Sequence, residues 1–147
     1  MKNESKLKPQ FAFFGSLTSK EIKDAFLSKY GKRPERNGNI WQLQFYDGTS
    51  ISITRREDAS STFQRLYEGF AAPIELFGLE EVYARDLNEM AIWLEATKQM
   101  EFWFEFSSDS LAAHAEVRVL LDCFLEAKSG YAYKLEESEF SSIGSPT

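Results

Sequence analysis

Met100-Glu101-Phe102-Trp103-Phe104-Glu105-Phe106 is the stretch that decides the fold, because its apolar and charged residues alternate. Alternation is the period of a β-strand, whose successive side chains point to opposite faces of a sheet. One face of this strand carries three phenylalanines and calls for a hydrophobic core. The other carries Trp103 between Glu101 and Glu105, which is unusual for a purely solvated face. These three residues are therefore the predicted partner-binding site.

Trp103 has a second interpretation that depends on what covers the sheet. If helices cover both faces, Trp103 belongs to the core and the two glutamates need buried partners. If helices cover only one face, the ring and the carboxylates stay open to a partner. The sequence leaves both arrangements open.

Capping signals mark a helix that follows the first strand. Thr18 and Glu21 form a T-x-x-E capping box, and Leu17 and Ile22 occupy the positions of a hydrophobic staple. Gly31 supplies the C-terminal stop. The sequence therefore predicts a helix between Thr18 and Gly31.

The register of one β-hairpin follows from its turn. A two-residue Asp47-Gly48 turn would mix apolar and polar residues on both faces of the hairpin. A three-residue loop, Tyr46-Asp47-Gly48 with a left-handed glycine, instead pairs Leu43 with Ile51 and keeps each face of one character. We therefore predict the three-residue loop.

The other elements follow from periodicity and from turn residues. We expect one long helix from 79 to about 97. A shorter helix that starts at its own cap near Asp86 and leaves residues 80–85 extended stays open as an alternative. The first half of the chain is expected to hold a flexible arm at 1–9, a strand at 11–14 and a loop at 32–39. A Ser61/Gln64 capping box opens a short helix, which Pro73 separates from a strand at 74–77. The second half is expected to hold the long helix from 79 to about 97, a helix from about 110 to 128 ended by Gly130, a strand at 131–135 and a flexible tail at 138–147.

The order of these elements favours an α+β fold. We expect a single mixed sheet that includes the β-hairpin, with about four helices packed mainly on one face. Its parallel part would be a crossover from strand 100–106 to strand 131–135 through the helix between them.

The composition describes an ordinary globular chain with an acidic balance. Of the 147 residues, 43% are hydrophobic and 27% are charged, and the formal net charge is −6. This length fits a single domain spanning 1–147. The lack of a basic field argues against direct nucleic-acid binding, whereas the negative charge suits a basic protein partner.

The chain is poor in the residues that most catalytic and metal sites need. His114 is the only histidine and Cys123 the only cysteine, which excludes multi-histidine zinc sites, cysteine-based zinc sites and an intrachain disulfide. Glycine-rich phosphate motifs are missing as well. We therefore predict no catalytic residue, no metal and no cofactor, although two suitably spaced carboxylates would suffice for a Mg²⁺ or acid–base site.

Targeting signals are equally sparse. Residues 1–10 lack the apolar stretch of a secretory signal, and no run approaches the roughly 20 apolar residues that cross a bilayer. With its single cysteine, the chain is expected to be cytoplasmic and to make no membrane contact.

These observations favour a non-enzymatic domain that binds a basic protein. Within that class, an immunity or inhibitor protein that neutralises a basic toxin or nuclease by occlusion fits the size, the acidity and the poor catalytic inventory. The alternative is a small-molecule-binding domain or a carboxylate-dependent enzyme with a pocket between sheet and helices. Homo-oligomerisation stays open.

Overall fold

The computed structural model describes residues 7–135, except for the side chains of residues 111 and 112, and the chain divides into two compact units. The sheet unit combines the chain up to Arg56 with the chain from Phe102 onward, and the helical unit spans Glu57–Glu101. In chain order the elements are β1 (Lys8–Phe14), α1 (Ser19–Tyr30), β2 (Glu35–Asn37), β3 (Ile40–Gln44), β4 (Ser50–Glu57), α2 (Ala59–Leu76), α3 (Ala84–Thr97), β5 (Phe102–Ser108), α4 (Leu111–Ala127) and β6 (Tyr131–Lys134).

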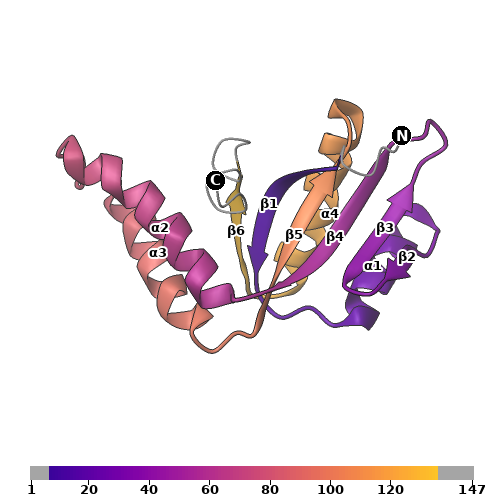
Figure 1. Cartoon of the computed structure of the whole chain (residues 1–147), viewed down its shortest axis with the longest axis horizontal. Helices are drawn as coiled ribbons and strands as arrows, with labels where there is room; N and C mark the ends of the chain where they lie inside the picture. The colour runs from indigo at the N-terminus through magenta and orange to yellow at the C-terminus, as the bar shows by residue number, and fades with distance from the viewer. Residues whose placement is uncertain (1–6, 136–147) are drawn as a thin grey trace. The chain divides into compact units, whose positions relative to one another are not determined.

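The six strands form one antiparallel sheet with the order β2-β3-β4-β5-β1-β6 (Figure 1). The α+β class and the single sheet are therefore confirmed. The sheet is antiparallel rather than mixed, because β1 lies between β5 and β6 and runs antiparallel to both. The two strands that we expected to pair in parallel thus share a direction but are separated by the N-terminal strand.

The core of the sheet unit lies on the face of the sheet that α1 and α4 cover. The alternation along the deciding stretch is confirmed, since Phe104 and Phe106 are buried on this face. Helix α4 faces the same core with Ala113, Val117, Leu120, Leu121 and Phe124. The core cluster comprises Phe11, Phe13, Leu17, Ile22, Phe26, Trp41, Leu43, Ile51, Ile53, Phe104, Phe106, Ala113, Val117, Leu120, Leu121 and Phe124.

Both local predictions that rest on specific backbone hydrogen bonds are confirmed. The Thr18 hydroxyl accepts from the Glu21 amide, the Glu21 carboxylate accepts from the Thr18 amide, and Gly31 ends α1 in the left-handed region. In the β3–β4 hairpin Leu43 faces Ile51, and the loop has a left-handed Gly48 at φ 89°.

Two predictions at the edges of the sheet unit are wrong in part. Lys8 and Pro9 belong to β1 rather than to a flexible arm, while residues 1–6 and the predicted tail at 138–147 lie outside the described residues. The predicted loop at 32–39 contains strand β2, which pairs with β3. Gly38 and Asn39 form the turn of this second hairpin, in which Asn37 faces Ile40.

The helical unit departs most from expectation. Helix α2 starts at Ala59 rather than at a Ser61 cap, and it continues through Pro73, so the strand expected at 74–77 does not form. A proline inside a helix forfeits one backbone hydrogen bond but does not oblige the chain to stop. Helix α3 begins at Ala84, between the two alternatives considered, because residues 80–83 form turns.

Gly130 has a different role from the one expected. Helix α4 ends at Ala127 with Lys128 as its cap, so the glycine is not the helix stop. A Cβ atom at Gly130 would lie 2.5 Å from Cζ of Phe13, closer than real Cβ contacts. The glycine is therefore needed for the close approach of β6 to the Phe13 ring.

Candidate functional site

The structure separates the three residues of the predicted partner-binding site. Trp103 is buried, and its ring stacks on Phe14 with centroids 5.6 Å apart. Glu105 lies on the same face of β5 and is also buried. Glu101 precedes the strand, is exposed, and belongs to the helical unit. Trp103 is therefore not the exposed ring that the predicted partner-binding site requires.

The buried Glu105 carboxylate has a charged partner. Arg56, at the end of β4, donates to Oε1 of Glu105 from Nε at 3.2 Å and from Nη2 at 2.8 Å. The arginine side chain is 48% exposed, so the pair joins a buried carboxylate to the surface. The second carboxylate oxygen, Oε2, is buried without a hydrogen-bond partner in the described part of the chain. A partner-binding role for Glu101, Trp103 and Glu105 stays a prediction, without an exposed aromatic ring to support it.

The exposed apolar surface lies elsewhere, at the connection between α2 and α3. Among the described residues, six of the eight large hydrophobic side chains that are exposed belong to the helical unit. Leu76, Phe77, Val82 and Ile92 are between 68% and 78% exposed, and Leu79 and Tyr83 are more than a third exposed. We call these six residues the hairpin tip, although Ile92 lies farther along α3. Large exposed apolar side chains that gather in one region often mark an interaction site.

The hairpin tip is a hydrogen-bonded structure. Helix α2 ends in a Schellman motif, because the Leu79 amide donates to the Ile74 carbonyl at 2.9 Å and the Gly78 amide donates to the Glu75 carbonyl at 3.2 Å. Gly78 takes the left-handed conformation that this motif requires, at φ 65°. The residues on both sides of this glycine, Phe77 and Leu79, are exposed.

Further contacts fix the start of α3 against the end of α2. The Tyr83 amide donates to the Leu79 carbonyl at 3.2 Å, and the Tyr83 ring meets Phe70 of α2 edge-on with centroids 6.1 Å apart. Helices α2 and α3 pack against each other along the unit (Figure 1). The apolar side chains are therefore presented on a defined backbone, which lowers the entropic cost of binding.

The negative charge of the chain is concentrated in the same unit. Glu57–Glu101 contains ten acidic and three basic residues, a formal charge of −7, whereas the whole chain carries −6. The sheet unit is therefore close to neutral. Around the hairpin tip the exposed acids are Glu75, Glu80, Glu81, Asp86 and Glu89.

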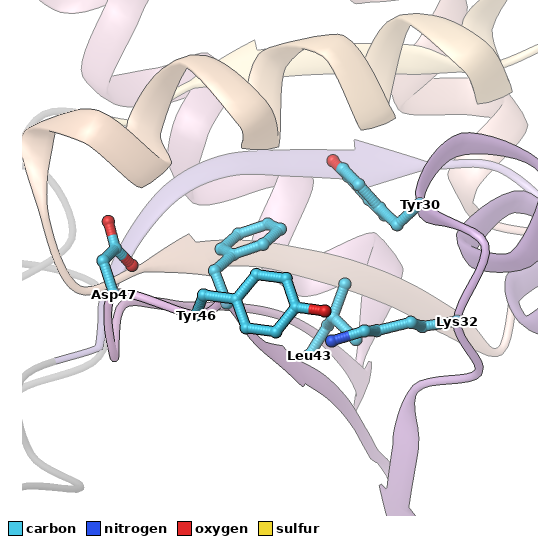
Figure 2. Close-up of a pocket in the computed structure, with 6 residues that line it drawn as sticks. Tyr30, Lys32, Leu43, Tyr46 and Asp47 are labelled. Atoms are coloured by element: carbon cyan, nitrogen blue, oxygen red, sulfur yellow. The ribbon is translucent and has the colours of Figure 1, made fainter.

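A separate hollow lies in the sheet unit, between the end of α1 and the β3–β4 hairpin (Figure 2). It has a volume of about 380 Å³. We call it the Tyr30 pocket; it is lined by Tyr30, Lys32, Leu43, Phe45, Tyr46 and Asp47. Its walls are mostly aromatic and aliphatic, with a lysine and an aspartate at its rim.

The Tyr30 hydroxyl is turned away from this pocket, toward α4. It lies 3.3 Å from both the backbone carbonyl and Oε1 of Glu116. Burial, followed by the nearby Glu116 carboxylate, raises the pKa of Tyr30 well above its usual range. The phenol therefore stays neutral and protonated, and its ring serves the pocket as a wall.

The remaining candidate groups do not converge on a catalytic arrangement. His114 is partly buried, 6.2 Å from the Phe11 ring centroid, and Cys123 is half-buried on α4. Within residues 7–135, no three His, Cys, Asp or Glu side chains are grouped so that they could hold a metal ion. The described helices include none long and apolar enough to cross a membrane.

Sequence reasoning missed the hairpin tip because its apolar residues resembled a buried helical stripe. Leu79, Tyr83 and Leu87 recur at helical spacing, which normally marks a core-facing side. The signal available was the run Leu76-Phe77-Gly78-Leu79, which has no polar side chain and is followed directly by Glu80-Glu81. Comparison of the chain with protein-family models, with curated proteins and with solved structures gives no match.

Proposed function

We propose that this chain is a protein-binding domain, and that the hairpin tip of the helical unit is the surface that contacts its partner. The single observation that carries the proposal is the concentration of exposed apolar side chains on a hydrogen-bonded, acid-rimmed connection. An exposed apolar surface on a fixed backbone is favourable for binding, since both the hydrophobic gain and the low ordering cost act in the same direction.

The partner that this surface fits is basic. The acidic residues around the hairpin tip attract positive charge and speed encounter, while the apolar residues supply the contact area. A complementary surface therefore has apolar groups at its centre and lysine or arginine side chains around them. The charge of −7 on the helical unit is the electrostatic support for this pairing.

The narrower form of the proposal is an immunity or inhibitor protein. Such a protein would occlude a cationic site on a basic toxin or nuclease, and the acidic hairpin tip would occupy that site. The support for this narrower form is the negative charge of the helical unit together with the exposed apolar side chains of the hairpin tip.

A capture experiment tests the proposal. The tagged full chain is used as bait in a lysate of the cells that encode it, beside the variants Phe77→Ser and Tyr46→Ser. Phe77 and Tyr46 are both exposed aromatic residues, but Tyr46 lies in the sheet unit. We expect a basic protein to be recovered stoichiometrically with the wild type and with Tyr46→Ser, and to be lost with Phe77→Ser. Equal recovery by all three baits would refute the hairpin tip as the contact surface.

The inhibitor form needs a second measurement on the captured partner. The toxic or nuclease activity of that partner is assayed while the chain is added up to one equivalent. Inhibition that saturates at one equivalent, and that Phe77→Ser abolishes, supports occlusion. An activity that does not change on binding leaves the domain a binding protein and contradicts the inhibitor.

A further inference from the structure

The structure assigns a second ligand to this chain: we infer that the Tyr30 pocket binds a small aromatic carboxylate. The pocket lies entirely in the sheet unit and shares no residue with the hairpin tip. The inference therefore does not depend on the proposed function.

The walls of the pocket select a flat apolar group. Leu43 is buried and closes the inner end, and the ring of Phe45 meets the ring of Tyr30 edge-on with centroids 5.4 Å apart. The edge-on pair leaves ring faces and edges available for a third aromatic ring. A volume of about 380 Å³ is at the lower end of the usual range for small-molecule sites, which suits one or two fused rings.

The charge at the rim selects an anion. The Asp47 carboxylate already accepts from the Thr49 amide at 3.0 Å and from the Thr49 hydroxyl at 2.7 Å through the same oxygen. These bonds hold the pKa of Asp47 below its usual range and orient its carboxylate within the β3–β4 loop. Within the described part of the chain, Lys32 forms no ion pair, and its ammonium group instead lies 4.5 Å from the centroid of the Tyr46 ring.

Lys32 and Tyr46 thus lie together at one end of the pocket, and Asp47 lies at the other (Figure 2). The Tyr46 side chain is 98% exposed, so it can move aside at little cost in buried area. A ligand ring packed against the outer side of the Tyr30–Phe45 pair would bring a carboxylate toward Lys32. The ammonium group then exchanges a cation–π contact for a charge-assisted hydrogen bond, which is the stronger interaction.

The test uses 2-naphthoate as the probe and 2-naphthamide as its uncharged counterpart. Each is titrated into the isotopically labelled full chain, and the backbone amide resonances are followed by NMR. We expect saturable shifts confined to the residues around the pocket, with the amide binding about tenfold more weakly than the carboxylate. Shifts that do not saturate at millimolar concentration, or equal affinity for the two probes, would overturn the inference.

Two charge variants isolate the role of Lys32. Lys32→Met removes the ammonium group and keeps much of the stem, and Lys29→Met removes an exposed charge from the last turn of α1. Both side chains are exposed, so an unchanged amide spectrum verifies the fold of each variant. We expect Lys32→Met to abolish the preference for naphthoate over naphthamide and Lys29→Met to retain it. Equal behaviour of the two variants contradicts the assignment of Lys32.

A cationic probe tests the sign of the site. The ammonium compound 2-naphthylmethylamine carries the same ring system with the opposite charge. Tighter binding of this amine than of naphthoate would show that Asp47 selects the ligand, and the inference of a carboxylate ligand would then be wrong.

Discussion

The phenylalanine-rich strand β5 and the hairpin tip are both unusually apolar, yet one is buried and the other is exposed. In β5, Phe104 and Phe106 face the core beneath α4, and even Trp103 on the opposite face is buried. At the hairpin tip, Leu76 and Phe77 are mostly exposed. The comparison teaches that an apolar pattern fixes the direction of a side chain within its element, whereas packing by other elements decides whether water reaches it.

The largest effect is expected from the same substitution made in both regions. Phe106→Ala removes a fully buried ring from the sheet core and should lower the free energy of unfolding by about 4 kcal/mol, through lost burial and the cavity left behind. Phe77→Ala removes a ring that is 69% exposed and should change it by less than about 0.5 kcal/mol. Urea denaturation measures both. Similar losses would show that the hairpin tip is packed in solution.

The next effect compares two glycines that are needed for different reasons. Gly130→Ala places a Cβ against the buried Phe13 ring and should lower the free energy of unfolding by about 3 kcal/mol, because a well-packed core has no room for an added methyl group. Gly78→Ala meets open space but keeps a left-handed φ, which should cost about 1 kcal/mol. Thermal and urea unfolding give the two values. A harmless Gly130→Ala would mean that β6 can shift away from Phe13.

A third effect compares an arginine that pairs with a buried carboxylate and an arginine that is exposed. Arg56→Met leaves the buried Glu105 side chain without its partner and should destabilise the chain by about 2 kcal/mol, less than for a fully buried pair since Arg56 is half-exposed. The double variant Arg56→Met/Glu105→Gln should recover most of that loss. Arg85→Met, which removes an exposed cation near the hairpin tip, serves as the control with little effect. If the double variant is no more stable than the single one, the ion pair is not the cause.

The smallest effect concerns a helix cap. Hydrogen bonds from Lys128 and from the Thr18 amide hold the pKa of Glu21 below its ordinary value of 4.5. The charged form is thus favoured by folding, so its stabilisation is present above about pH 4.5 and disappears as the pH falls through the lower pKa of the folded state. Glu21→Gln should cost about 0.5 kcal/mol at pH 7, where the site is partly exposed, and nothing at pH 2.

The control for this cap is Glu89→Gln in α3, which changes an exposed glutamate near the hairpin tip. No pH-dependent difference is expected for it. A difference between wild type and Glu21→Gln that persists unchanged to pH 2 would show that the carboxylate charge is not what stabilises the cap.

Sequence reasoning succeeded where short-range hydrogen bonds decide the structure. The capping box at Thr18 and the loop at Gly48 are complete within a few residues, so their chemistry is visible in the sequence. The alternation along β5 also predicted correctly that Phe104 and Phe106 face the core. These features depend on neighbours along the chain.

It failed where distant segments decide. The place of β1 between β5 and β6 depends on hydrogen bonds between the two ends of the chain, which no local pattern reports. The candidate site was missed because the helical spacing at Leu79 and Tyr83 predicted a helix, whereas both residues precede α3 and are exposed.

The position of the helical unit in the chain has an evolutionary consequence. Residues 58–101 join β4 to β5, which are neighbours in the sheet, so the proposed binding surface lies within a single connection between adjacent strands. The entropic cost of closing such a connection grows only slowly with its length. A descendant of this chain can therefore lengthen, shorten or exchange its recognition surface without redrawing the strand order that carries it.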